Sequence, residues 1–167
     1  MRCINIVHHI KITKGDYILK EIKIAIPGKP MGKQRPKFST QGKFVNARTP
    51  QETVNYENLV KILYRESYDG MSFEQDEPLE LIVNAYFLPP ANTSKKKLAL
   101  MYDNKIRPTK KPDFDNIAKI IGDALNAVAY PDDKQVVEAS IHKFYDTEPR
   151  VEITVRSILE SEETNNG

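Results

Sequence analysis

Alternating apolar and polar residues predict a first strand over residues 17–26. Ile22, Ile24 and Ile26 fall on one side of this segment, and a period of two is typical of a strand with one buried face. The Pro27-Gly28 dipeptide is a turn signal and ends the strand. Residues 79–88 are mostly apolar and are followed by two prolines, which predicts a second, largely buried strand.

Two more strands are predicted near the end of the chain, over residues 136–145 and 151–158. Only a short polar segment separates them, and strands that follow each other so closely usually lie side by side in a sheet. We therefore expect them to pair as an antiparallel hairpin around residues 146–150.

Two segments have the apolar spacing of helices. The first begins at Thr49-Pro50, an N-cap residue followed by proline at the first helical position, and Glu52 completes a capping box. This helix is predicted to run to about residue 67, with an apolar face made of Val54 or Tyr56, then Leu59, Val60, Leu63 and Tyr64. The clearest helix spans residues 114–128, and its apolar stripe is Ile117, Ile120, Ile121, Ala124, Leu125 and Val128.

The order of these elements is strand, helix, strand, helix, strand, strand, which predicts a single α+β domain with a mixed sheet packed against two main helices. The chain has 167 residues, 40% of them hydrophobic, and can bury an ordinary core. We expect the domain to span residues 17–158. Residues 1–16 would form a leader or an extra strand, and residues 159–167 a disordered acidic tail.

Several classes of protein are excluded by composition. The single cysteine, Cys3, forms no internal disulfide and no thiolate zinc site, and the three histidines lack the spacing of metal ligands. No stretch approaches the roughly 20 apolar residues of a membrane span, and the N-terminus lacks the pattern of a signal peptide. We expect a soluble cytoplasmic protein with no membrane partner.

Charge is distributed unevenly although the net charge is only +2. Residues 28–48 contain six cations and no acid, and residues 94–112 contain seven cations and one acid. Such segments favour binding to nucleic-acid phosphates. The predicted DNA contacts are Lys33, Arg35, Lys37, Lys110 and Lys111. Phe38 and Phe44 lie among the cations; packing within the fold is the favoured interpretation, and stacking on bases is the alternative.

Aspartates flank the clearest helix on both sides. Asp113 and Asp115 precede it or begin it, and Asp132 and Asp133 follow it. If Phe114 turns inward, the two carboxylates beside it face the same side, and the acids after the helix could join them around a hard divalent cation such as Mg²⁺. Such an ion would promote phosphodiester hydrolysis. The alternative is structural, because aspartate is common in helix caps and turns.

Lys119 lies one helical turn after Asp115. It forms either an i,i+4 ion pair or a contact with the scissile phosphate, and Asp123 is expected to orient it. Asn116 and Gln135 are candidate hydrogen-bond partners of the metal-binding acids.

The acidic segment has the pattern Asp113-x-Asp115-Asn116-x-x-Lys119-x-x-x-Asp123, followed by Asp132-Asp133-x-Gln135-Val136. This pattern resembles that of RusA-type Holliday junction resolvases. The resemblance implies a homodimer with an α+β fold that nicks four-way DNA junctions symmetrically in recombination and repair, often encoded by a prophage. It also implies Mg²⁺, or Mn²⁺ in its place, held by Asp113, Asp115 and Asp133 with Asp132 adjacent. Lys119 matches the catalytic lysine, so the catalytic set is Asp113, Asp115, Lys119 and Asp133.

One departure concerns the residues before the first aspartate, where the family often has arginines and this chain has Lys110-Lys111-Pro112. Two other functions compete with the nuclease. One is a catalytically inactive DNA-binding accessory protein of phage replication. The other is a Mg²⁺ enzyme acting on nucleotides, which the lack of a G-x-x-x-x-G-K-S/T loop disfavours, so no nucleotide cofactor is expected.

Overall fold

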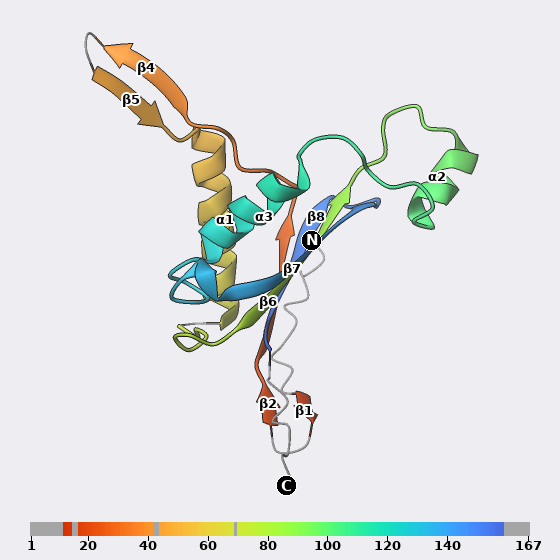
Figure 1. Cartoon of the computed structure of the whole chain (residues 1–167). Helices are drawn as coiled ribbons and strands as arrows, with labels where there is room; N and C mark the ends of the chain where they lie inside the picture. The colour runs from red at the N-terminus through yellow and green to blue at the C-terminus, as the bar shows by residue number, and fades with distance from the viewer. Residues whose placement is uncertain (1–11, 15–16, 42–43, 69, 159–167) are drawn as a thin grey trace, which may run out of the picture.

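The computed structural model describes residues 12–14, 17–41, 44–68 and 70–158. Its centre is a four-stranded sheet with the strand order β3-β8-β6-β7 (Figure 1). These strands are β3 (Glu21–Pro27), β6 (Leu79–Phe87), β7 (Val136–Tyr145) and β8 (Arg150–Ser157). Strand β6 pairs in parallel with β7 and antiparallel with β8, and β8 pairs antiparallel with β3. The sheet is therefore mixed, and the predicted α+β class is confirmed.

Helices α1 (Gln51–Tyr68) and α3 (Phe114–Leu125) form the main helical layer. They pack against each other, α1 also contacts β3, and α3 contacts β7. The apolar stripe of α3 is buried from Ile117 to Leu125, as predicted. The helix ends before Val128, because Ala127 adopts a left-handed conformation with a φ of 58° and cannot continue it.

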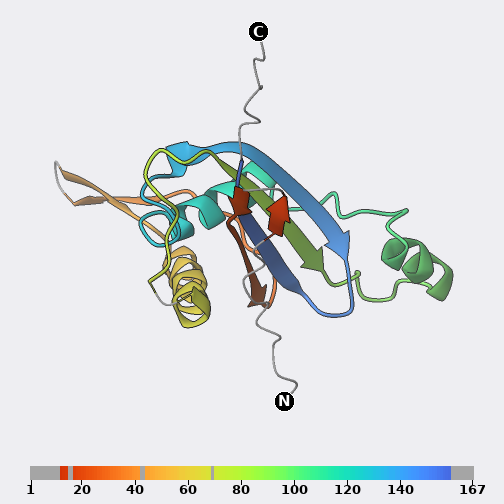
Figure 2. The same ribbon diagram turned by 90° about the horizontal axis from the view of Figure 1, so that it is seen from below.

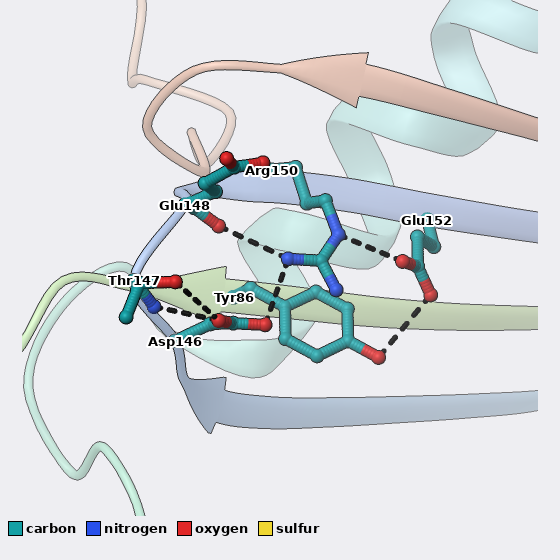
Figure 3. A network of polar contacts seen from close by, with 6 residues as sticks. All are labelled: Tyr86, Asp146, Thr147, Glu148, Arg150 and Glu152. Carbon is teal, nitrogen blue, oxygen red and sulfur yellow. Dashed lines mark hydrogen bonds and ion pairs between the residues drawn. The ribbon is translucent and has the colours of Figure 1, made fainter. Parts of the chain in front are cut away.

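The predicted hairpin between the last two strands is wrong, because β6 lies between β7 and β8. The helical connection from β6 to β7 allows these two strands to pair in parallel. The chain then crosses the end of β6, where the Asp146 amide donates to the Phe87 carbonyl at 2.9 Å. On the far side, Arg150 bonds to Asp146 and Glu152 at 2.8 and 2.7 Å (Figure 3). These ion pairs stabilise the connection from β7 to β8.

At the N-terminus, the predicted strand over residues 17–26 is divided at Lys20. Its first part, β2 (Tyr17–Leu19), pairs with β1 (Ile12–Lys14), and β3 enters the central sheet. The rest of the expected leader and the expected tail over residues 159–167 lie outside the described residues.

Two excursions extend from the core on different sides (Figures 1 and 2). The first is a hairpin next to the start of α1, formed by β4 (Lys37–Gln41) and β5 (Phe44–Arg48). The second joins β6 to α3 and carries the helix α2 (Lys95–Tyr102), whose N-cap is Ser94. The hairpin carries the end of the first cation-rich segment, and the second excursion carries all of the other one. In the described residues, no helix is long and apolar enough to cross a membrane.

Candidate functional site

Two carboxylates lie exposed where α3 begins. Asp113 is the N-cap residue, but its side chain makes no capping hydrogen bond, and Asp115 lies in the first turn. Both side chains are exposed. The expectation that Phe114 turns inward is wrong, because 68% of it is exposed. The helix starts at this residue, so Asp113 and Asp115 are presented by a helical turn and not by an extended strand.

The backbone that leads into Asp113 is anchored to β7. The Lys143 Nζ atom donates to the carbonyls of Lys110 and Pro112, at 2.5 and 3.0 Å. Burial lowers the pKa of Lys143, and the negative charge of Asp113 opposes this shift. Sequence analysis missed Lys143, since nothing in its local pattern links it to residues more than 30 positions earlier.

The same segment also contacts the loop that follows β3. A Cβ atom at Gly32 would lie 2.7 Å from Pro112 Cβ and 3.1 Å from Asn116 Cβ. The Lys33 amide also donates to the Asn116 carbonyl at 2.8 Å. Asn116 is therefore a packing partner of the loop, and its side chain also donates to Asp115 at 3.5 Å.

This contact forms one wall of an open groove of about 860 Å³. The polar residues that line it include Lys29, Arg35, Lys111, Asp113 and Asn116. Cations from both basic segments thus share a groove with one of the predicted metal-binding acids. The groove has the charges needed to hold a phosphate backbone beside a carboxylate.

Lys33 has a different environment from the other predicted DNA contacts. Its Nζ atom lies 2.5 Å from Glu57 Oε1 on α1 and 2.7 Å from Asp123 Oδ2 on α3. Burial lowers its pKa, but the bonds to Asp123 and Glu57 outweigh burial and raise it overall. Lys33 lines the same groove and has a structural role in these ion pairs, and its predicted contact with DNA stays a prediction. The expected pairing of Asp123 with Lys119 is wrong, because Asp123 binds Lys33.

The remaining predicted contacts are accessible. Exposed side chains belong to all four of them, namely Arg35, Lys37, Lys110 and Lys111, and Lys119 on α3 is exposed as well. Phe38 is 69% exposed, which contradicts the packing interpretation for this residue. The side chain of Phe44 lies outside the described part of the structure.

The acids after α3 surround the short 3-10 helix η1 (Asp133–Gln135). Asp132 caps η1 by accepting from the Lys134 amide at 3.0 Å, and this bond is the main cause of its lowered pKa. Gln135 completes a capping box and donates to the carbonyls of Glu74 and Glu77, at 2.7 and 3.1 Å. Gln135 is buried and anchors the loop after α1. Its Oε1 atom also accepts from the Asp132 amide at 3.3 Å, so it supports this acid through the backbone. Asp133 itself is exposed.

The predicted convergence of acids from both sides of α3 is not seen within one chain. Among the described residues, no group of three or more potential ligands could hold a metal ion. The reason is geometric, because the 12-residue helix keeps its two ends about 18 Å apart. Asp113 lies near Lys143, whereas Asp133 influences Tyr130 beyond the other end of α3. Figure 1 shows the start of β7 near that end.

Asp113 and Asp115 still suit a hard cation as a pair. Mg²⁺ is often bound by one or two carboxylates, with water and substrate phosphate completing its shell. Both side chains are exposed, and Asp113 does not use its oxygens to cap α3. The pair could therefore supply oxygen ligands without losing a bond that stabilises the helix.

An α+β domain with exposed carboxylates beside a cation-lined groove has the features of an enzyme that cleaves nucleic acid. The model of a family described as "Endodeoxyribonuclease RusA" matches residues 27–156. The chain therefore belongs to the RusA endodeoxyribonuclease family, as the signature around Asp113 indicated. It is also similar to the uncharacterized protein YqaN of Bacillus subtilis (strain 168), with 34% identity over 139 residues, covering 82% of this chain and 96% of YqaN.

Proposed function

We propose that this protein is a Mg²⁺-dependent endonuclease that resolves four-way DNA junctions by paired phosphodiester hydrolysis in recombination and repair, and that it acts in the cytoplasm. Mn²⁺ is the expected substitute for Mg²⁺. The observation that carries the proposal is the pair Asp113 and Asp115, exposed at the start of α3 beside a cation-lined groove in a member of a nuclease family.

In this proposal, Asp113 and Asp115 hold the ion. A bound Mg²⁺ would polarise the scissile phosphoryl group and lower the pKa of a water molecule. Lys119 is exposed one turn after Asp115 and would offset negative charge as it develops on the phosphate. Arg35, Lys37, Lys110 and Lys111 would bind the flanking phosphates, so affinity should fall as salt rises.

The separation of the acids supports a homodimer. If Asp133 is a ligand together with Asp113 and Asp115, a single chain cannot supply all three, because α3 holds them apart. A second copy could bring its own Asp133 to the pair at the start of α3. A two-fold dimer would then carry two such sites, which suits two symmetric cuts in a four-way junction.

The first test compares the wild type with Asp115→Asn on a synthetic four-way junction and a linear duplex of matched sequence. We expect Mg²⁺-dependent nicking of the junction by the wild type. The variant should lose cleavage by at least about a hundredfold, because it loses a metal ligand, but bind the junction within about twofold, because the cations are unchanged. Junction binding without nicking by the wild type would instead favour an inactive accessory protein.

The shared site is tested by mixing two inactive variants, Asp115→Asn and Asp133→Asn. If each site takes ligands from both chains, a mixed dimer contains one site with every ligand and one with neither acid. Mixing after partial unfolding and refolding should then restore single-strand nicking, although each variant alone is inactive. If all ligands came from one chain, every site in the mixture would lack one acid, and no activity would return.

A further inference from the structure

The proposed function assigns no role to Lys143, although its side chain touches the segment that carries Asp113. We propose that Lys143 is a positioning residue, which fixes residues 110–112 and thereby holds Asp113 in the orientation that binds a divalent cation. This inference rests on the proposed metal-binding role of Asp113 and goes beyond it.

The contacts of Lys143 are directed at the backbone. Its ammonium has three N–H donors, and two of them reach the carbonyls of Lys110 and Pro112, at 2.5 and 3.0 Å. Asp113 follows Pro112 directly. Hydrogen bonds from a charged donor are stronger than those from a neutral one, so these bonds restrict the backbone immediately before the carboxylate.

The base of Lys143 is itself fixed. Arg107 donates from Nε to the Lys143 carbonyl at 2.6 Å, and its guanidinium lies 3.9 Å from the centre of the Phe144 ring. Lys143 also pairs with Ala85 in the register of β6 and β7. The ammonium therefore extends from a strand of the central sheet, which is a more rigid support than a loop.

A second contact also holds residues 110–112. Pro112 lies against Gly32, where even one added carbon would come within 2.7 Å of Pro112 Cβ. Lys143 and the Gly32 loop thus both contact the segment that leads into the acid pair. Such surrounding contacts commonly set the geometry of metal ligands, and their loss typically lowers metal affinity or activity by about 10–100-fold.

The positive charge of Lys143 allows positioning to be distinguished from electrostatics by the direction in which cation affinity changes. The ammonium lies close enough to Asp113 for their charges to interact. Removing a positive charge near a cation site should, by electrostatics alone, strengthen cation binding. Weaker binding after loss of the ammonium would therefore point to lost positioning and could not come from the change of charge.

The test measures Mn²⁺ binding to the free full-length protein by electron paramagnetic resonance, so it does not depend on cleavage. The variants are Lys143→Met, which removes the donors, and Lys143→Arg, which keeps charged donors in a different geometry. Lys61→Met on α1 removes a lysine elsewhere and serves as the matched control. Thermal unfolding and junction binding in EDTA are recorded for each protein.

We expect Lys143→Met to weaken Mn²⁺ binding about tenfold, Lys143→Arg to lie between it and the wild type, and Lys61→Met to match the wild type. Junction binding in EDTA should stay within about twofold. Unchanged or tighter Mn²⁺ binding by Lys143→Met would overturn the proposal, even if the protein unfolds at a lower temperature. A wild type that binds no Mn²⁺ would also overturn the proposal. If the wild type binds Mn²⁺ as expected but nicks no junction, the proposed function fails and the positioning role stands.

Discussion

The close contact between Gly32 and Pro112 predicts a specific cost for adding a single methyl group. In Gly32→Ala, the new Cβ would lie 2.7 Å from Pro112 Cβ and 3.1 Å from Asn116 Cβ. The Pro112 carbon belongs to a ring closed onto the backbone and cannot rotate away. The Gly32 loop cannot move freely either, because the Lys33 amide is bonded to the Asn116 carbonyl at 2.8 Å.

Overpacking of this kind costs about 1–3 kcal/mol. Replacing glycine by alanine also restricts the unfolded chain, which returns about 0.4–1 kcal/mol. The net loss in the free energy of unfolding should be about 1.3 kcal/mol, within a range of about 0–2.6 kcal/mol. For a chain of this length, each kcal/mol corresponds to about 2–4 °C, so the melting temperature should fall by about 3–5 °C.

Gly122→Ala is the matched control, because the same substitution in α3 places a Cβ with nothing within 4 Å. Alanine is favoured over glycine in a helix by about 1 kcal/mol, so this variant should be more stable than the wild type. Urea unfolding of the three proteins measures both effects. If Gly32→Ala proved as stable as Gly122→Ala, the loop and α3 would not be in the close contact described here, and the groove beside Asp113 would lose one of its walls.

Two further predictions concern the loops that close the fold. Gln135→Ala should lower the free energy of unfolding by about 1–3 kcal/mol, because the Glu74 and Glu77 carbonyls lose their donor; a loss below 0.5 kcal/mol in urea unfolding would contradict this. The hydrogen bond from Arg150, more than any other contact, holds the Asp146 pKa below its ordinary 3.8. A lowered pKa adds stability that is fully present above pH 3.8 and is lost as the pH falls through the lowered value, so the advantage of wild type over Asp146→Asn should shrink in acid. Acid titrations of both proteins by circular dichroism check this, and a constant difference would refute it.

The sequence predicts those parts of the fold whose signal is local. The stripe of α3 and the alternation in β3 are periodic, and both elements form as predicted. The predicted pairing of β7 with β8 is wrong because strand pairing here depends on residues that are far apart in the sequence. Adjacency in sequence favours a hairpin, but β6, which lies some 50 residues earlier, pairs with both strands and separates them. Which strand becomes the neighbour of β7 depends on how three strands align with one another, and this cannot be predicted from the local pattern of any one of them.

In the candidate site, too, the sequence predicts the features whose signal is local and not those that depend on long-range contacts. The signature from Asp113 to Gln135 identifies the family, because its residues and their spacing are local. The contacts of Gly32 and Lys143 with the segment before Asp113 are long-range and leave no local signal. The orientation of Phe114 was misjudged, because the extended geometry assumed for Asp113 and Asp115 gives way to a helix that already starts at Phe114.

The structure also separates the five aspartates of the signature by what they contact. Asp123 is paired with Lys33, and Asp132 caps η1 and pairs with Lys134, so both have structural roles. Of these five aspartates, the three that take no part in the ion pairs of the described residues are Asp113, Asp115 and Asp133. An exposed acid without a cation is ordinary on its own. Here, however, the three without ion pairs are the three that the metal proposal needs, so a metal bound by Asp113, Asp115 and Asp133 would disrupt none of the ion pairs in the described structure. The predicted metal contact of Asp132 stays a prediction.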